Sequence, residues 1–238
     1  MKPSDLQEMQ SASIDPDLYD SSGPRENKVR KIIGSFPPGQ KILDVGCANG
    51  AMLAPFAKRH ELHGVDISAS MLSSAARAGF QTVLVDLEVN PLPYPDKTFD
   101  VLFCGENIEH YVNTDWVLSE LNRVLKPGGR LVFTFPNIRT PIGVAMLVFA
   151  DLPPMFAARY RASHFRDFTV RLAKWALSNH NFSVDRCIGS CFYIPKLGDC
   201  GAWLAEWIPS WSSTVIVLGT KLKDSAYDAK TAIEEIPR

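Results

Sequence analysis

The sequence predicts an α/β protein built on a largely parallel β-sheet. Between residues 41 and 220, short runs rich in Val, Ile, Leu and Phe alternate with segments typical of helices. Strands separated by helices require right-handed crossover connections, which place the strands parallel in one sheet. A chain of 238 residues can bury the core that such a domain needs.

The elements can be assigned in chain order. The first is a helix in "PRENKVRKIIGSF", residues 24–36, which Pro37 and Pro38 end. Gly128 and Gly129 suit a turn between the helix expected at residues 114–126 and the strand expected at residues 130–135. The remaining expected elements are strand 41–45, helix 50–60, strand 62–66, helix 69–79, strands 82–86 and 99–104, helix 114–126, strand 130–135, helix 168–180, and strands 182–188 and 213–220.

Two segments, 138–166 and 190–212, interrupt the alternation with many apolar and aromatic residues. Both follow predicted strand ends, the edge at which open α/β sheets bind ligands, so we expect two insertions that cover the acceptor site. Residues 1–24 are polar and rich in Ser, Asp and Pro, which predicts a flexible arm. Because the chain has no internal repeat, we treat residues 1–238 as a single domain.

Composition and charge narrow the possible partners. A net charge of −1 with well-mixed charges makes nucleic acid an unlikely partner. The five cysteines form no CxxC pair, which indicates reduced thiols in a cytoplasmic protein. The N-terminus lacks the pattern of a signal peptide, and the longest apolar run, residues 142–150, is too short to cross a bilayer. We therefore expect a cytoplasmic protein without a transmembrane segment.

The stretch "ILDVGCANG", residues 42–50, places an acid and two glycines where a strand ends and a helix is expected to begin. This is the general arrangement of a nucleotide-binding loop, although no P-loop consensus is present. Asp44 would repel a pyrophosphate at this helix N-terminus. It suits instead a ligand that brings a positive charge, such as an α-ammonium group.

The next two strand ends also carry acids. Asp66 in "GVDIS" is placed to accept hydrogen bonds from the two hydroxyls of a ribose. Asp86 in "VDLEV", together with the backbone of Leu87, can face an adenine edge. Ammonium, ribose and adenine without phosphate describe S-adenosylmethionine.

With these motifs, residues 41–129 resemble the class I S-adenosylmethionine-dependent methyltransferases. The resemblance is carried by "LDVGCANG", Asp66, Asp86, "FDVLFCGENIEH" and "ELNRVLKPGGRLVFTFPN". It implies a Rossmann-like fold with a seven-stranded, mostly parallel sheet, an antiparallel last strand and helices on both faces. Ala48 stands where the family usually has a glycine, which is tolerable if its φ is negative. The implied cofactor-binding residues are Asp44, Gly46, Cys47, Ala48, Gly50, Asp66, Ile67, Asp86, Leu87 and Glu106.

Methyl transfer to oxygen requires alignment of the acceptor and removal of its proton. In "CGENIEH", Glu106, Glu109 and His110 follow helical spacing on one face of a turn, and His164 precedes a predicted helix. These four residues are similar to the Glu-x-x-Glu-His motif and distant histidine of metal-dependent small-RNA 2′-O-methyltransferases and ubiquinone-pathway O-methyltransferases. They could therefore hold Mg, Mn or Zn. Alternatively no metal binds, the glutamate caps the turn, and His110 acts as a base or lines the pocket. His110, Glu109 and His164 are the candidate catalytic residues.

The two insertions supply candidate acceptor contacts. Trp203, Trp207 and Trp211 are spaced four apart, which favours core packing over substrate contact. A membrane-surface role is disfavoured because that segment has few basic residues. Aromatic and apolar candidates in the first insertion are Phe149, Met155, Phe156 and Tyr160. Arg159, Arg161 and Arg166 flank His164 and either bind an acidic acceptor group or form a solvated helix edge.

The leading prediction is an S-adenosylmethionine-dependent methyltransferase for a small-molecule acceptor, most simply an O-methyltransferase in metabolite, sugar or quinone-type biosynthesis. One alternative is an RNA terminal 2′-O-methyltransferase, suggested by the Glu-x-x-Glu-His motif. Another is a non-catalytic partner subunit with the same fold, suggested by Ala48. The sequence predicts neither the acceptor nor the oligomeric state.

Overall fold

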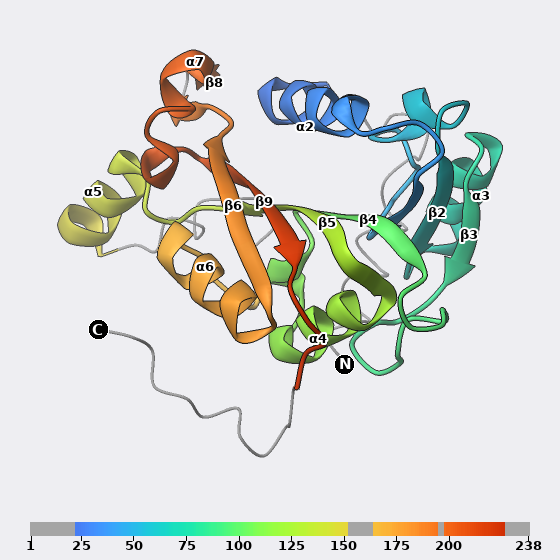
Figure 1. The fold of residues 1–238 in the computed structure, drawn as a ribbon. Coiled ribbons are helices and arrows are strands. Elements are labelled where there is room, and N and C mark those ends of the chain that lie inside the picture. The colour runs from blue at the N-terminus through green and yellow to red at the C-terminus, as the bar shows by residue number, and fades with distance from the viewer. Residues whose placement is uncertain (1–21, 152–163, 195–197, 227–238) are drawn as a thin grey trace.

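The computed structural model describes residues 22–151, 164–194 and 198–226, so most of the predicted N-terminal arm lies outside the described residues. A seven-stranded sheet forms the centre of the molecule (Figure 1). Its strand order is β3-β2-β1-β4-β5-β9-β6. The strands are β1 (Lys41–Val45), β2 (Glu61–Asp66), β3 (Gln81–Leu84), β4 (Phe99–Gly105), β5 (Leu125–Pro136), β6 (Phe182–Gly189) and β9 (Thr214–Lys221).

The direction of the last strand matches the prediction. Strands β1 to β5 pair in parallel, whereas β9 lies between β5 and β6 and is antiparallel to both. All seven predicted strands are therefore confirmed. The carboxyl ends of β1, β2 and β4 and the start of β9 meet at one edge of the sheet, where the predicted site residues lie.

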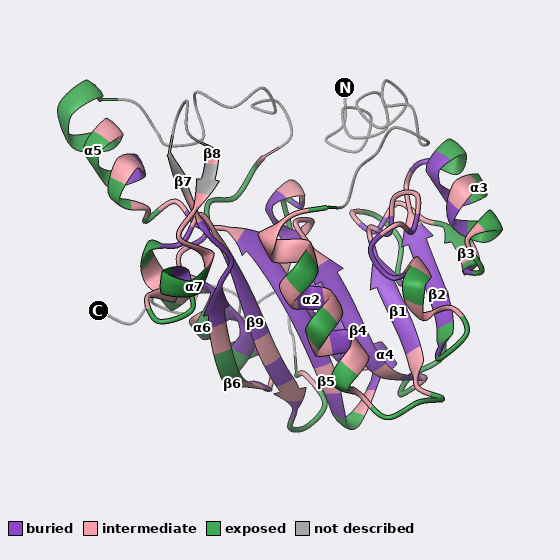
Figure 2. Cartoon of the chain, turned by 90° about the horizontal axis from the view of Figure 1, so that it is seen from above, coloured by how far each residue is buried: buried purple, intermediate pink, exposed green. Residues whose placement is uncertain are grey.

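Helices cover both faces of the sheet. They are α2 (Pro24–Ser35), α3 (Ala69–Arg77), α4 (Thr114–Val124) and α6 (Val170–Asn179). Alternation along β4 sends Leu102 into the core shared with α4 and α6, and sends Phe103 into the core shared with α2 and α3. Figure 2 shows α2 crossing the sheet on one side, with α4 and α6 behind it. Two buried layers on either side of the strands are expected for a parallel sheet.

The predicted helix 50–60 is wrong. The chain there forms turns and the short 3₁₀-helix η2 (Ala54–Phe56). Pro55 supplies no backbone N–H and restricts the residue before it, so an α-helix does not propagate. Downstream, β5 begins earlier than predicted and passes through Gly128, whose φ is +74°. The pairing with β4 changes register between Phe99 and Val101, so this region forms an irregular strand instead of a separate turn.

The insertions add small elements beyond the β5–β9–β6 half of the sheet. The first contains α5 (Pro141–Ala150), and residues 152–163 that follow it lie outside the described residues. The second insertion is joined to α2. Lys28 of that helix donates to the carbonyls of Ser190 and Ala202, and to the carbonyl of Gly189 at the end of β6. No helix in the described ranges is long and apolar enough to cross a membrane. The second insertion contains β7 (Phe192–Ile194), β8 (Gly198–Cys200), α7 (Ala202–Ala205) and η5 (Pro209–Trp211).

Candidate active site

The loop after β1 has the geometry that its two glycines suggest. The N–H groups of Gly46 and Cys47 donate to the carbonyl of Val65 at 2.8 and 3.1 Å, which joins the loop to the end of β2. Gly46 has φ +74°, and a Cβ there would overlap the side-chain amide of Asn107. Gly50 has φ +77°, and a Cβ there would lie 2.9 Å from the Phe80 ring. Both positions therefore need glycine for conformation and for space.

Ala48 departs from the prediction. Its φ is +46°, in the left-handed region, so the condition of a negative φ is not met. The Ala48 N–H donates to Asp66 Oδ2 at 2.9 Å, which accounts for the conformation being held. The loop therefore carries local strain that a glycine would relieve.

Asp44 is a buried acid at the end of β1. Its side chain is 2 % exposed, and Oδ2 has no hydrogen-bond partner within the part of the chain described. Burial, and then the nearby Asp66 charge, raise the pKa of Asp44 well above its usual value, while Arg25 opposes the shift. An unpaired buried carboxylate is costly, and a cationic donor in the loop would offset that cost. The site thus fits the α-ammonium group expected from the sequence.

Asp66 joins β2 to the glycine loop. Oδ2 accepts from Ala48, and Oδ1 accepts from the N–H of Ser68 at 2.9 Å. Burial raises the pKa of Asp66, while backbone donors from Ser68, Ala48 and Ile67 limit the increase. Since each carboxylate oxygen can accept more than one hydrogen bond, Asp66 retains acceptor capacity for ribose hydroxyls.

The predicted adenine contacts lie in a turn after β3. Asp86 Oδ1 accepts from the N–H of Glu88 at 3.0 Å, and the Asp86 carbonyl accepts from Asn90 at 2.9 Å. The side chain of Leu87 is buried, and its carbonyl accepts from the indole of Trp116 at 3.1 Å. Trp116 was not among the predicted site residues. It fixes the backbone that was predicted to face adenine.

Glu106 lies beside α2. It has φ +50°. Its Oε1 accepts from the hydroxyl of Thr134 at 3.3 Å and lies 3.8 Å from a guanidinium nitrogen of Arg25. Burial raises the pKa of Glu106, and Arg25 is the largest opposing influence. Arg25 also limits the increase in the pKa of Asp44 and of Glu109. A single guanidinium therefore stabilises the ionised form of all three acids, Glu106 included.

The sequence motifs did not identify Arg25 or Asn107. Arg25 precedes β1 by 16 positions and reaches the site only because α2 packs across the sheet. Asn107 donates from Nδ2 to the Val45 carbonyl at 2.9 Å, in the space that Gly46 leaves open. The one sequence signal for Asn107 was its position between the two candidate acids of "GENIE".

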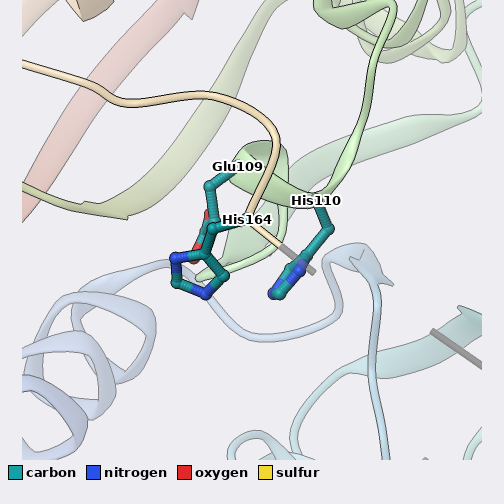
Figure 3. Close-up of side chains that lie close together, drawn as sticks. All are labelled: Glu109, His110 and His164. Carbon is teal, nitrogen blue, oxygen red and sulfur yellow. The ribbon is translucent and has the colours of Figure 1, made fainter. Parts of the chain in front are cut away.

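Glu109, His110 and His164 form one cluster. Figure 3 shows Glu109 and His110 on the same turn, η3 (Ile108–His110), with His164 approaching from a separate segment. Ligand atoms of the three side chains all lie within 4.8 Å of one another. The two imidazole rings are 4.7 Å apart between centroids and nearly perpendicular. Glu106 is not part of this set, although it was predicted as a fourth metal ligand.

The backbone holds the cluster together. The N–H groups of Phe165 and Arg166 donate to the Glu109 carbonyl at 2.8 and 3.2 Å, so the segment after the first insertion is tied to η3. Glu109 is 1 % exposed, and its Oε2 has no partner among the described residues. Burial and then Glu106 raise the pKa of Glu109. Burial and then His110 lower the pKa of His164 to about 4, so its ring is neutral near pH 7.

This donor set is chemically versatile. Two imidazoles and a carboxylate are ligands that Zn and Mn accept, and an unpaired buried oxygen is a consistent feature of such a site. Without a metal, the raised pKa makes the Glu109 carboxylate a stronger base than an ordinary glutamate.

The predicted use of the tryptophans in core packing is wrong. Trp203, Trp207 and Trp211 are 72 %, 81 % and 47 % exposed. They do not share a helix face, because α7 has only four residues and ends before Trp207. Arg166 donates to the Val112 carbonyl at 2.7 and 3.1 Å and is fixed there. Met155, Phe156, Arg159, Tyr160 and Arg161 lie outside the described residues.

A cavity of about 240 Å³ lies between the two insertions. Its lining is largely apolar and comes from the start of α5, from β7 and β8, and from η5. Its lining residues are Thr140, Pro141, Ile142, Phe192, Cys200, Trp211 and Ser213.

Residues 43–133 match the family model described as a methyltransferase domain. The chain is 37 % identical over 127 residues to demethylmenaquinone methyltransferase from Symbiobacterium thermophilum, covering 47 % of this chain and 49 % of that protein. It is 30 % identical over 125 residues to 27-O-demethylrifamycin SV methyltransferase from Amycolatopsis mediterranei, covering 48 % and 46 %. The chain thus spans about half the length of the curated relatives it matches.

A solved structure supports the fold. The chain aligns with a Thermotoga maritima protein described as an S-adenosylmethionine-dependent methyltransferase and possible histamine N-methyltransferase. The TM-score is 0.62 at 18 % identity, and the alignment covers 84 % of this chain and 89 % of that one.

Proposed function

We propose that the chain is a class I S-adenosylmethionine-dependent methyltransferase and that it transfers a methyl group from S-adenosylmethionine to a hydroxyl of a small molecule. The observation that carries the cofactor assignment is the unpaired oxygen of buried Asp44 beside a loop that requires Gly46 and Gly50. In this proposal Asp44 accepts from the α-ammonium group, Asp66 accepts from the ribose hydroxyls, and Asp86 with Leu87 faces the adenine.

Methyl transfer to a hydroxyl, as opposed to another acceptor, is favoured by the cluster of Glu109, His110 and His164. The cofactor supplies an already activated methyl on a sulfonium, so the chain must orient the acceptor, exclude water and remove one proton. In the metal-free form of the proposal, that proton moves from the acceptor oxygen to Glu109 Oε2. His110 and His164 position the hydroxyl before the proton leaves, and the acceptor oxygen then takes the methyl as the sulfonium becomes a neutral thioether.

The same three residues are the proposed ligands if a divalent metal is resident. A bound metal would lower the pKa of the acceptor hydroxyl. The neutral state of His164 leaves a nitrogen lone pair available for such a role. Glu106 is left out of the proposed ligand set because it contacts Arg25 and Thr134 instead.

Calorimetry tests the cofactor assignment. S-adenosylmethionine is titrated into metal-stripped wild-type protein, Asp44→Asn and Asp96→Asn, the last being an exposed acid paired with Arg123. Wild type and Asp96→Asn should bind, and Asp44→Asn should bind at least about tenfold more weakly, because a charged hydrogen bond is lost. Absence of binding to wild type would favour the non-catalytic subunit.

A second titration separates base from metal. Mg, Mn and Zn are titrated into wild type and Glu109→Gln. Heat that is lost in Glu109→Gln supports a metal at the cluster, whereas no heat supports direct proton removal by Glu109. In either case Glu109→Gln should retain S-adenosylmethionine binding, and loss of that binding would contradict the assigned role.

A further inference from the structure

Helix α5 leaves an unusual apolar surface exposed. All ten residues, "PIGVAMLVFA", are uncharged and lack polar side chains, and Gly143 is the only one that is buried. Leu147, Val148 and Phe149 are 54 %, 67 % and 87 % exposed. Figure 2 shows α5 extending from the body of the protein with mostly exposed colouring. A surface of this kind on a folded domain marks an interaction site.

The distribution of these residues around the helix indicates what covers it. A partner protein covers one stripe of an amphipathic helix, with polar residues on the opposite side. In α5, exposed apolar positions 144, 145, 147, 148, 149 and 150 are separated by 100° steps and surround the helix axis. A helix that is apolar on every side suits an apolar medium that can enclose it. At ten residues, or about 15 Å, α5 is too short to span a bilayer but long enough to enter one leaflet.

The sequence that contains α5 carries an excess of basic residues, which favours an anionic lipid surface. Residues 137–168 contain four arginines and two aspartates, a formal excess of +2, in a chain whose net charge is −1. The arginines of this segment are Arg139, Arg159, Arg161 and Arg166, of which Arg159 and Arg161 lie outside the described residues, and the acids are Asp151 and Asp167. Basic residues beside an inserted apolar helix are attracted to anionic head groups.

The base of α5 also joins the apolar cavity. Pro141 and Ile142, at the start of the helix, line the cavity together with Trp211, whose side chain is 47 % exposed. Partly exposed tryptophans favour the boundary between apolar and aqueous phases. The cavity is therefore continuous with the exposed helix.

We propose that α5 is an interfacial anchor that inserts into the surface of an anionic membrane and brings the cavity at its base to that surface. This inference does not depend on the methyltransferase activity, because it rests on the exposure of α5, the basic sequence that contains it and the cavity. The few basic residues of the tryptophan segment argued against a membrane role for that segment alone. The first insertion supplies the basic residues that the tryptophan segment lacks, and α5 supplies an exposed apolar helix.

Vesicle flotation tests the proposal in the absence of S-adenosylmethionine and acceptor. The full chain is mixed with vesicles of phosphatidylcholine containing 30 % phosphatidylglycerol, or of phosphatidylcholine alone. The test variant is Leu147→Gln/Phe149→Gln. The matched control is Val89→Gln/Leu222→Gln, at two residues that are 59 % and 64 % exposed elsewhere. Thermal unfolding of both variants checks that they fold.

Wild type and the control should float with the anionic vesicles, and binding by the test variant should be at least about tenfold weaker. Flotation should fall with added salt and with neutral vesicles. No flotation of wild type, or equal flotation of both variants, would overturn the proposal. Sedimentation equilibrium supplies a further outcome: a wild-type dimer that Leu147→Gln converts to a monomer would assign α5 to a second copy of the chain and overturn the lipid assignment.

Discussion

Replacement of Ala48 by glycine should stabilise the protein. Ala48 has φ +46°, and a left-handed conformation costs an L-residue about 1–2 kcal/mol. Glycine avoids that cost but loses about 0.5–1 kcal/mol more backbone entropy on folding. The difference predicts that Ala48→Gly raises the free energy of unfolding by about 0–1.5 kcal/mol, with a central value of about 0.75 kcal/mol. For a chain of this size, that central value should raise Tm by about 1–4 °C.

Urea unfolding of the ligand-free protein provides the assay, with circular dichroism as the probe. The control is Ala78→Gly at the end of α3, where φ is −80° and glycine relieves no strain. That variant should lose about 0.5–1 kcal/mol. If Ala48→Gly lost as much stability as Ala78→Gly, the assignment of strain to this loop would be wrong. Equal m-values for wild type and both variants would support a common unfolded state.

Three further predictions concern polar groups that are buried or half-buried. Asp44→Asn should stabilise the ligand-free protein at pH 7 by about 1–3 kcal/mol, because it removes an unpaired buried charge. Since the folded pKa of Asp44 is raised, wild type should lose stability relative to Asp44→Asn as pH rises from about 4, and parallel urea-unfolding profiles would contradict this. The pKa of His164 is lowered to about 4 when folded, so the unfolded chain binds its proton first as pH falls. Wild type should therefore lose stability between about pH 6.5 and pH 4 relative to His164→Gln, measured by unfolding midpoints at pH 7 and pH 5. Lys221 is buried and donates to the carbonyls of Asn122 and Leu125 at 2.8 and 3.0 Å, so Lys221→Met should cost about 2–4 kcal/mol. Lys97 is the matched control, because it is exposed and pairs with Asp224, the acid that also pairs with Lys221. Lys97→Met should lower Tm much less than Lys221→Met. Similar losses of Tm in the two variants would refute a special role for burial.

Local sequence was sufficient where a short segment decides its own conformation. The seven strands followed from runs of β-branched and apolar residues, and their alternation predicted the parallel order. The glycine loop was predictable because Gly46 and Gly50 adopt backbone conformations that other residues avoid. The wrong prediction of a helix at residues 50–60 also has a local cause. Pro55 disfavours an α-helix there, but the apolar pattern of the segment suggested one.

Local sequence failed where a property depends on distant parts of the chain. Helical spacing suggested that the tryptophans were buried, but burial depends on a partner surface, and the fold leaves Trp203 and Trp207 exposed. The φ of Ala48 follows from a hydrogen bond to Asp66, 18 positions away. The grouping of Glu109 with His164, and not with Glu106, follows from backbone hydrogen bonds between two loops.

The sequence by itself determined the sheet, the glycine loop and the chemical types at each strand end, because these depend on backbone preferences and on residues close in the chain. Tertiary structure decided which acids stand alone and which are paired. Within the described residues it leaves Asp44 Oδ2 without a hydrogen-bond partner, places Arg25 beside Glu106 and exposes α5. These outcomes arise from packing between segments far apart in sequence, where burial and charge are set by neighbours that no local pattern specifies.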